Sequence, residues 1–217
     1  MMHIYPSLMS VMSANLEDEI DLLQPYCTGF HLDVMDNQFV PNSALSIDTV
    51  NNIAKMVNKP VWLHLMVKNP EQFYTQFFLP HDSLVSFHIE SEVDVNEFVK
   101  IIREKKQRPS IAINPKTPLE QIFPFLNIVD QVLLMSVEPG FSGQRFLSES
   151  LFRLEKLTAY RKKHEHVFSI GIDGGIDSNN IKMIAEKGVD DYAIGSGIFN
   201  QPDHLVALHE LVEAVAK

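Results

Sequence analysis

Eight short runs rich in β-branched and other apolar residues recur along the chain, and this repeat constrains the fold more than any other feature. The segments between the runs place apolar residues at helical spacing, which indicates a strand alternating with a helix. Most runs are apolar at both alternating positions, as parallel strands are when both their faces are covered. We expect strands at 4–10, 29–35, 60–67, 84–89, 109–114, 131–137, 168–173 and 191–195, with a helical segment after each.

Eight such units predict a single (β/α)8 TIM barrel of parallel strands over residues 1–217. The length of 217 residues suits one barrel, and no low-complexity stretch or Gly/Ser linker marks a second domain. An open doubly wound sheet would show the same periodicity. However, no G-x-G-x-x-G follows the first run, so a dinucleotide site is not indicated.

Charge and cysteine content narrow the possible partners and compartments. The net charge of −10 disfavours a nucleic-acid or anionic-membrane surface, so any phosphate site must be built locally. The single cysteine, Cys27, cannot form an internal disulfide, and the sequence has no bilayer-length apolar run and no secretion signal at its start. We expect a cytoplasmic protein with no nucleic-acid or membrane partner. Apolar helix faces allow a homo-oligomer, although no feature fixes its symmetry.

Ionisable residues stand at the carboxyl ends of three expected strands, where a barrel builds its sites. His31 and Asp33 share one face of their strand because strand side chains alternate, His64 lies on the next strand, and Asp173 ends the seventh. Taken singly, each histidine reads as a hydrogen-bonded core residue and each aspartate as a cap. Together the two carboxylates need positive charge, and these strand ends contain no Lys or Arg. The pattern predicts a bound cation.

The donor set indicates both the kind of metal and the kind of reaction. Two imidazoles and two carboxylates suit one divalent ion among Zn²⁺, Fe²⁺, Mn²⁺ and Co²⁺ better than Ca²⁺ or Mg²⁺, without choosing among the four. A cation beside carboxylates favours removal of a proton next to a carbonyl. Asp33 and Asp173 come from separated strands, so they can flank a substrate on both faces. Two-base proton transfer there would invert a stereocentre.

Glycine-bearing turns follow strands six, seven and eight, and together they predict a site for an anionic group. The turns are Gly140-Phe141-Ser142-Gly143, Gly174-Gly175 and Gly195-Ser196-Gly197. Any one of them alone is equally well explained as a tight turn, and the absence of a Walker motif argues against a nucleoside triphosphate.

Several apolar and polar residues near strand ends have two interpretations. Met35, Met66 and Met135 either fill the core or form an apolar wall that excludes water from the site, whereas Met9 is interpreted as core filling. His88 and Asn114 are weaker site candidates, since structural hydrogen bonding explains either. Trp62 is interpreted as a packing residue on the helix-facing side of its strand.

Motifs spread along nearly the whole chain resemble the ribulose-phosphate 3-epimerase family. They include His31-Leu32-Asp33-Val34-Met35-Asp36, His64-Leu65-Met66-Val67 and Asp173-Gly174-Gly175-Ile176, together with the stretches 6–10, 39–42, 69–71, 114–115, 117–118, 138–146 and 195–199. The resemblance implies a barrel of the ribulose-phosphate-binding type. The family reaction interconverts ribulose 5-phosphate and xylulose 5-phosphate in the pentose phosphate pathway, through a metal-stabilised enediolate.

The resemblance also implies roles for individual residues. It makes His31, Asp33, His64 and Asp173 the metal ligands, and Asp33 and Asp173 the catalytic acid/base pair. The implied contacts to the small phosphorylated ketose are Ser7, His64, Gly140, Phe141, Ser142, Gly143, Gly174, Gly175, Gly195 and Ser196.

Some positions depart from the family pattern without removing an expected ligand. Ser10-Val11-Met12 replaces the usual Ser-Ala-Asp, Asn37-Gln38 replaces Gly-His, and Trp62 stands where Asp is common. Because Ser7-Leu8-Met9 resembles the related allulose 6-phosphate 3-epimerases, a hexulose phosphate is the alternative substrate.

Two further alternatives belong to other functional classes. A barrel lyase or decarboxylase would need a lysine at a strand end, whereas Lys55, Lys59, Lys68 and Lys116 fall in expected helices or loops. A non-catalytic sugar-phosphate-binding barrel is the other alternative, and the intact His/Asp set argues against it.

Overall fold

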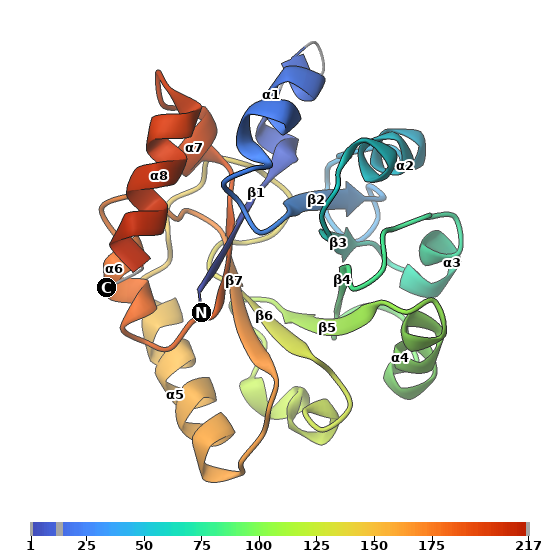
Figure 1. Cartoon of the computed structure of the whole chain (residues 1–217). Helices are drawn as coiled ribbons and strands as arrows, with labels where there is room; N and C mark the ends of the chain where they lie inside the picture. Colours follow the sequence, from blue (N-terminus) through green and yellow to red (C-terminus); the bar gives the residue numbers. More distant parts are fainter. Residues whose placement is uncertain (1, 12–14, 216–217) are drawn as a thin grey trace.

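The computed structural model describes residues 2–11 and 15–215, so Met12 lies outside the described part. Its eight strands form one parallel sheet in the order β1-β8-β7-β6-β5-β4-β3-β2. A parallel bridge between Ser7 and His31 brings the ends of this sheet together, and Figure 1 shows the resulting ring. The strands are β1 (His3–Pro6), β2 (Phe30–Met35), β3 (Val61–Met66), β4 (Leu84–His88), β5 (Arg108–Ile113), β6 (Gln131–Met135), β7 (Ser169–Asp173) and β8 (Asp191–Ile194).

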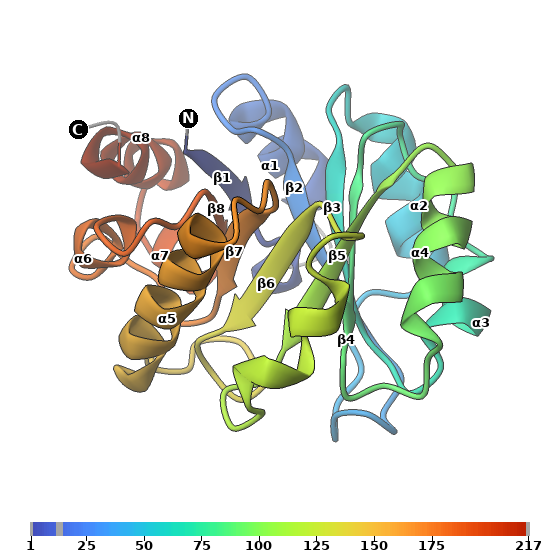
Figure 2. The ribbon, with the colours of Figure 1, turned by 90° about the horizontal axis from the view of Figure 1, so that it is seen from below.

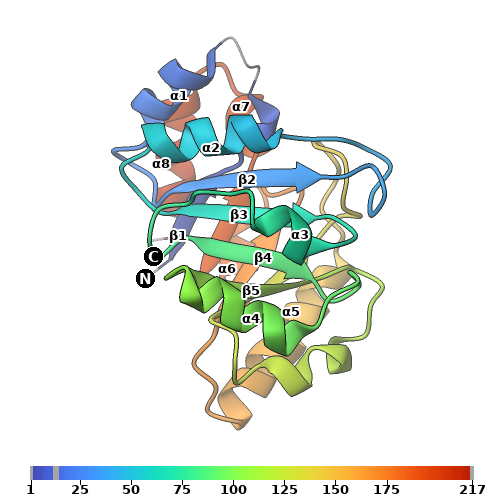
Figure 3. The same ribbon diagram turned by 90° about the vertical axis from the view of Figure 1, so that its right-hand side faces the viewer.

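Helices surround the ring of strands, as the side views in Figures 2 and 3 show. They are α1 (Leu16–Leu23), α2 (Ile47–Met56), α3 (Pro70–Tyr74), α4 (Val95–Glu104), α5 (Glu149–Lys163), α6 (Ile181–Ala185), α7 (Ser196–Phe199) and α8 (His204–Val215). Among the helices that the structure describes, none combines the length and hydrophobicity that a membrane crossing needs. The expected fold class, a single (β/α)8 barrel, is confirmed.

One expected helix was wrong, and the first expected strand was too long. The segment after β5 forms two 3-10 turns, η3 (Leu119–Gln121) and η4 (Phe123–Phe125), instead of a helix. Pro124 lacks the N–H that a continuous helix would need there. The first strand ends at Pro6, and η1 (Leu8–Ser10) follows it. Leu8 is fully buried, and a buried turn has the same apolar composition as a strand.

Side chains from the strands build two cores, one on each face of the sheet. Leu32, Leu63 and Leu65 pack outward with the helices, whereas Tyr5, Trp62 and other residues fill the barrel interior. The expectation that Trp62 faces the helices was therefore wrong. It shares the inward parity of His64 on β3. Space for its indole comes from Gly171 on β7, where a Cβ would lie 2.7 Å from Trp62 Cη2.

A hydrogen-bonded polar chain occupies the interior toward the amino ends of the strands. Trp62 Nε1 donates to Ser86 Oγ at 2.7 Å, Ser86 donates to Ser110, and Ser110 donates to Gln131 Oε1. Gln131 Nε2 then donates to Asp191 Oδ2 at 2.8 Å. We call these residues, with Ser169 and His3 that also bond Asp191, the lower polar chain.

Candidate metal centre

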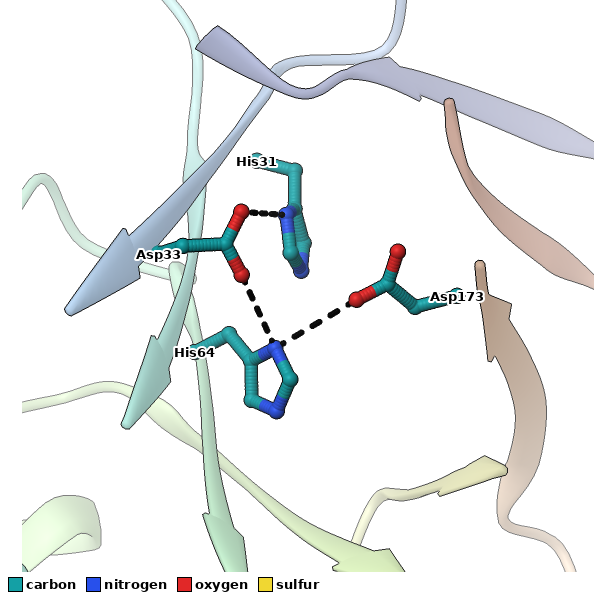
Figure 4. Close-up of side chains that lie close together, drawn as sticks. All are labelled: His31, Asp33, His64 and Asp173. Atoms are coloured by element: carbon teal, nitrogen blue, oxygen red, sulfur yellow. Dashed lines mark hydrogen bonds and ion pairs between the residues drawn. The ribbon is translucent and has the colours of Figure 1, made fainter. Parts of the chain in front are cut away.

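The carboxyl ends of β2, β3 and β7 bring His31, Asp33, His64 and Asp173 together, as the sequence predicted. Strand alternation places His31 and Asp33 on the inward face of β2, and the β2–β3 register pairs Asp33 with His64. Asp173 is the last residue of β7. One donor atom from each of the four lies within 4.8 Å of the others, and Figure 4 shows the side chains pointing toward a common centre.

The distances within the cluster define which atoms face the centre. His64 Nδ1 lies 3.1 Å from Asp33 Oδ1 and 3.5 Å from Asp173 Oδ2. His31 Nδ1 lies 3.4 Å from Asp33 Oδ2, and Ser7 Oγ donates to the same oxygen at 2.9 Å. Both histidines are fully buried, Asp33 is 4% exposed, and Asp173 is partly buried. The carboxylates therefore converge on one imidazole nitrogen in a site largely shielded from water.

Burial and mutual charge shift the pKa values of the cluster in opposite directions. Burial raises the pKa of Asp33, but His31 and His64 outweigh it and hold that pKa well below its ordinary value. Burial lowers the pKa of His64, whereas its hydrogen bonds to Asp173 and Asp33 raise it to about 9. Without a cation, His64 is therefore a protonated partner of the two carboxylates at neutral pH. A metal ion would displace the proton on Nδ1.

The residues present fit a divalent cation. His31 Nε2 is buried and has no hydrogen-bond partner among the described residues, a costly arrangement that coordination would relieve. Two nitrogens and two carboxylate oxygens are ligands that first-row divalent metals accept. The set could therefore hold one metal ion, with His31, Asp33, His64 and Asp173 as its ligands.

A pocket lies above the cluster, and Asp33 and Asp173 form part of its wall. The expected contact residues Ser7, Gly140, Phe141, Ser142, Gly143, Gly174, Gly175, Gly195 and Ser196 all line it, as do Met35, Met66 and Met135. His64 does not line the pocket, since it is fully buried beneath the carboxylates. The structure thus places the glycine turns and the two aspartates around one cavity.

Glycine is required where the turn after β7 meets the turn after β6. Gly175 has a φ of +67°, and a Cβ there would lie 2.4 Å from the backbone nitrogen of Phe146. Ser136 Oγ donates to the carbonyl oxygens of Asp173 and Gly174 at 2.9 and 2.7 Å. These contacts hold the backbone of the turn after β7 beside the carboxylate of Asp173.

The turn after β6 is tied to other loops at the mouth of the barrel. Ser142 Oγ lies 2.9 Å from Ser10 Oγ, and Asn42 Nδ2 donates to the carbonyl of Gly140 at 2.7 Å. Ser10, Val137, Pro139 and Gln144 also line the pocket, although sequence analysis did not single them out. Two of the four, Pro139 and Gln144, adjoin expected contact residues in the chain, which was the available signal.

The structure adds to the sequence-based interpretations of Met9 and His88. Met9 packs with Met35 and Met66, in agreement with core filling, but it is only partly buried and also lines the pocket. His88 is hydrogen-bonded, as expected, but its partner is a candidate ligand: His88 Nε2 lies 2.9 Å from His64 Nε2. Burial lowers the pKa of His88 to about 4, so this ring is neutral.

Comparisons with known proteins agree with this arrangement. A model of the ribulose-phosphate 3 epimerase family matches residues 3–199. A ribulose-phosphate 3-epimerase of Aquifex aeolicus is 38% identical over 173 residues, which cover 80% of this chain and 78% of the relative. The cytoplasmic isoform of ribulose-phosphate 3-epimerase from Oryza sativa is 35% identical, covering 97% of this chain and 94% of the relative. The structure of 3-hexulose-6-phosphate synthase from Salmonella typhimurium superposes with a TM-score of 0.70 at 14% identity, covering 99% of both chains, and this likeness concerns the fold alone.

Proposed function

The chain belongs to the ribulose-phosphate 3-epimerase family, and on that basis we propose that it inverts C3 of D-ribulose 5-phosphate to give D-xylulose 5-phosphate. One observation carries the proposal: two aspartates approach the same imidazole nitrogen from opposite sides of the cluster, and both line the pocket (Figure 4). A substrate in the pocket would thus have a carboxylate on each face. Such a pair is what inversion at carbon requires.

In the proposed mechanism, Asp33 and Asp173 exchange roles with the direction of reaction. One carboxylate takes the proton from C3, and the carboxylic acid of the other returns a proton to the opposite face of the same carbon. The hydrogen bond from Ser7 Oγ orients Asp33 through Oδ2. One divalent ion among Zn²⁺, Fe²⁺, Mn²⁺ and Co²⁺, when bound by His31, Asp33, His64 and Asp173, would stabilise the negative charge of the enediolate.

The remaining pocket residues would bind and shield the substrate. The turns 140–143, 174–175 and 195–196 line the pocket, and their backbone N–H groups are candidate phosphate and sugar contacts. Met35, Met66 and Met135 would exclude water from the reacting carbon, since all three are nearly fully buried beside the aspartates. Excluding water protects the deprotonated substrate from unwanted protonation.

Cellular setting belongs to the same proposal. We propose that residues 1–217 work as one barrel domain in the cytoplasm, in the pentose phosphate pathway. The resemblance of the Oryza sativa relative, whose name specifies a cytoplasmic isoform, supports this location.

Proton NMR in D₂O tests the reaction directly. Metal-loaded protein is expected to convert D-ribulose 5-phosphate to D-xylulose 5-phosphate and to exchange the C3 hydrogen for deuterium. Parallel turnover of D-allulose 6-phosphate decides between a pentulose and a hexulose phosphate. Folded, metal-loaded protein that neither converts nor exchanges either sugar would refute the epimerase proposal, and release of a carbon fragment would indicate a lyase.

A further inference from the structure

A second histidine stands directly behind the candidate ligand His64. His88 ends β4, and its Nε2 lies 2.9 Å from His64 Nε2. The two rings are nearly coplanar, with an interplanar angle of 22° and centroids 5.1 Å apart, so the facing nitrogens lie edge to edge. Both rings are fully buried, and Phe39 packs against His88 with centroids 4.8 Å apart. The contact is therefore a hydrogen bond between two imidazoles in an enclosed space.

One proton must lie between these two nitrogens. Two N–H groups facing each other would clash, and two lone pairs would repel without a bond. If the proton is on His64 Nε2, a neutral His64 keeps a lone pair on Nδ1, the atom that faces Asp33 and Asp173. If the proton is on His88 Nε2, a neutral His64 carries its own proton on Nδ1, where it would block a cation. The position of this proton therefore decides whether His64 can be a ligand.

Glu90 decides the position of the proton. Its Oε2 lies 3.2 Å from His88 Nδ1, and an ionised carboxylate only accepts hydrogen bonds, so His88 carries its proton on Nδ1. The Nε2 of a neutral His88 is then an acceptor for His64. Glu90 is itself held, because its Oε1 accepts the backbone N–H of Asn114 at 2.9 Å. Arg153 in turn fixes that loop by donating to the carbonyls of Asn114 and Thr117.

We propose that His88 and Glu90 are positioning residues that hold the proton of His64 on Nε2 and so keep its Nδ1 free for a divalent cation. The inference rests on the metal centre of the proposed function, and it extends that centre by two residues outside the ligand set. Hydrogen-bond partners of metal-ligating histidines fix the ring's tautomer and orientation, and their loss typically weakens metal binding about 10- to 100-fold. Neither residue would contact the cation or the substrate.

Substitution of Glu90 tests the contact farthest from the metal in this relay, by which we mean the hydrogen bonds from Glu90 through His88 to His64. In Glu90→Gln, the amide oxygen can accept a hydrogen bond from either His88 Nδ1 or the N–H of Asn114, but not from both. In either orientation, the amide NH₂ would face the remaining donor. We expect calorimetric Zn²⁺ affinity to fall about 10- to 100-fold. Glu92→Gln is the matched control, since Glu92 lies two residues away in an exposed ion pair with Lys68. Equal Zn²⁺ affinities for Glu90→Gln and Glu92→Gln would overturn the proposal.

Substitution of His88 tests the contact to His64 itself. His88→Phe keeps a planar ring without an acceptor, whereas the amide oxygen of His88→Gln can still accept from His64 Nε2. Zn²⁺ affinity should fall for Phe and be largely retained for Gln. If both variants bind Zn²⁺ equally well, a packing role suffices and the proposal fails.

Nitrogen-15 NMR of the Zn²⁺-loaded wild-type protein reads the tautomer without any substitution. His88 is expected to carry its hydrogen on Nδ1 and His64 on Nε2, and a hydrogen on His88 Nε2 would contradict the proposal. This readout does not depend on turnover. Wild-type protein that binds Zn²⁺ with the expected tautomer but does not epimerise would count against the proposed reaction and leave the relay standing.

Discussion

The two ends of the barrel interior both contain buried polar residues, but the two sets differ in completeness. In the lower polar chain, Asp191 accepts from Gln131 and Ser169 and lies 2.9 Å from His3 Nδ1. At the other end, Asp33 and Asp173 converge on His64, and the buried Nε2 of His31 has no partner among the described residues. The first set satisfies its hydrogen-bonding groups internally, whereas the second leaves a buried nitrogen that a metal ion could bind.

This difference shows why burial of polar residues does not by itself mark a functional site. Both sets are mostly buried, although His3 is only partly buried, and each contains aspartate and histidine. The lower polar chain alternates donors and acceptors along Trp62, Ser86, Ser110 and Gln131, so it fills the interior without external charge. The cluster of His31, Asp33, His64 and Asp173, at the upper end of the barrel, has an excess of acceptors around His64 Nδ1. That excess, rather than polarity, is what predicts a cation.

Asp173→Asn breaks the comparison at the upper end and should have the largest effect. It removes one of the two groups that exchange protons with substrate carbon, so kcat for epimerisation should fall by about 10²- to 10⁴-fold. Steady-state assays with D-ribulose 5-phosphate measure the loss. Asp191→Asn, which alters the lower polar chain, serves as the control and should keep kcat within a few-fold of wild type. Full activity of Asp173→Asn would show that two bases are not needed.

The two ends should respond to pH with opposite signs. Because the pKa of His64 is raised from 6.5 to about 9, its stabilisation of the metal-free fold is complete below pH 6.5 and is lost as pH rises through about 9. Burial raises the pKa of Asp191, but hydrogen bonds from His3, Ser169 and Gln131 outweigh burial and leave the pKa below its ordinary value of 3.8. The stability that Asp191 contributes is therefore complete above pH 3.8 and is lost as the solution becomes more acidic.

The affinity for Zn²⁺ should depend on pH because His64 must lose a proton to bind the metal. A cation must displace one proton from His64, so Zn²⁺ affinity should rise by about tenfold per pH unit up to about pH 9. Calorimetric titrations across this range, corrected for Zn²⁺ hydrolysis, measure the slope. An affinity independent of pH would mean that His64 is not a ligand.

Metal removal should destabilise the protein at the candidate metal centre and leave the lower polar chain unaffected. Zn²⁺ at about one hundred times its dissociation constant is expected to raise the free energy of unfolding by about 2.7 kcal/mol, and a chelator should remove this gain. Denaturant titrations with and without chelator measure the difference. Asp191→Asn should retain the gain, whereas Asp33→Asn should lose most of it. The same gain in Asp33→Asn would place the metal elsewhere.

Asp191→Asn sharpens the comparison at the lower end, with the smallest expected effect. Its amide can replace only one of the two acceptor oxygens, so a donor among Gln131, Ser169 and His3 would lose its partner. The free energy of unfolding should fall by about 1–3 kcal/mol. Urea unfolding of the metal-loaded protein measures this loss. An unchanged free energy would indicate that the lower polar chain adjusts without cost.

The sequence revealed the parts of the site that depend on local geometry. Alternation along β2 is enough to put His31 and Asp33 on one face, and the position of Asp173 follows from where β7 ends. The pairing of Asp33 with His64 depends on the register between strands, which is a long-range property. The contact between His88 and His64 likewise depends on the closeness of β3 and β4. A lone histidine at a strand end does not indicate its partner.

Trp62 shows where sequence reasoning failed. Alternation with His64 places Trp62 inside the barrel, in contrast to its interpretation as a packing residue on the helix-facing side. The space exists only because Gly171, 109 positions later in the sequence, has no side chain. Such complementarity between distant strands cannot be read from either strand alone.

The same fit between Trp62 and Gly171 imposes an order on the evolutionary changes open to this barrel. Any side chain at 171 would collide with the indole, whereas a smaller residue at 62 would leave a cavity and remove the hydrogen bond to Ser86. A lineage would therefore enlarge position 171 after shrinking position 62, because the reverse order would first place a side chain against the indole. The residue at position 62 thus determines which residues position 171 can accept, whereas position 62 is free to change first.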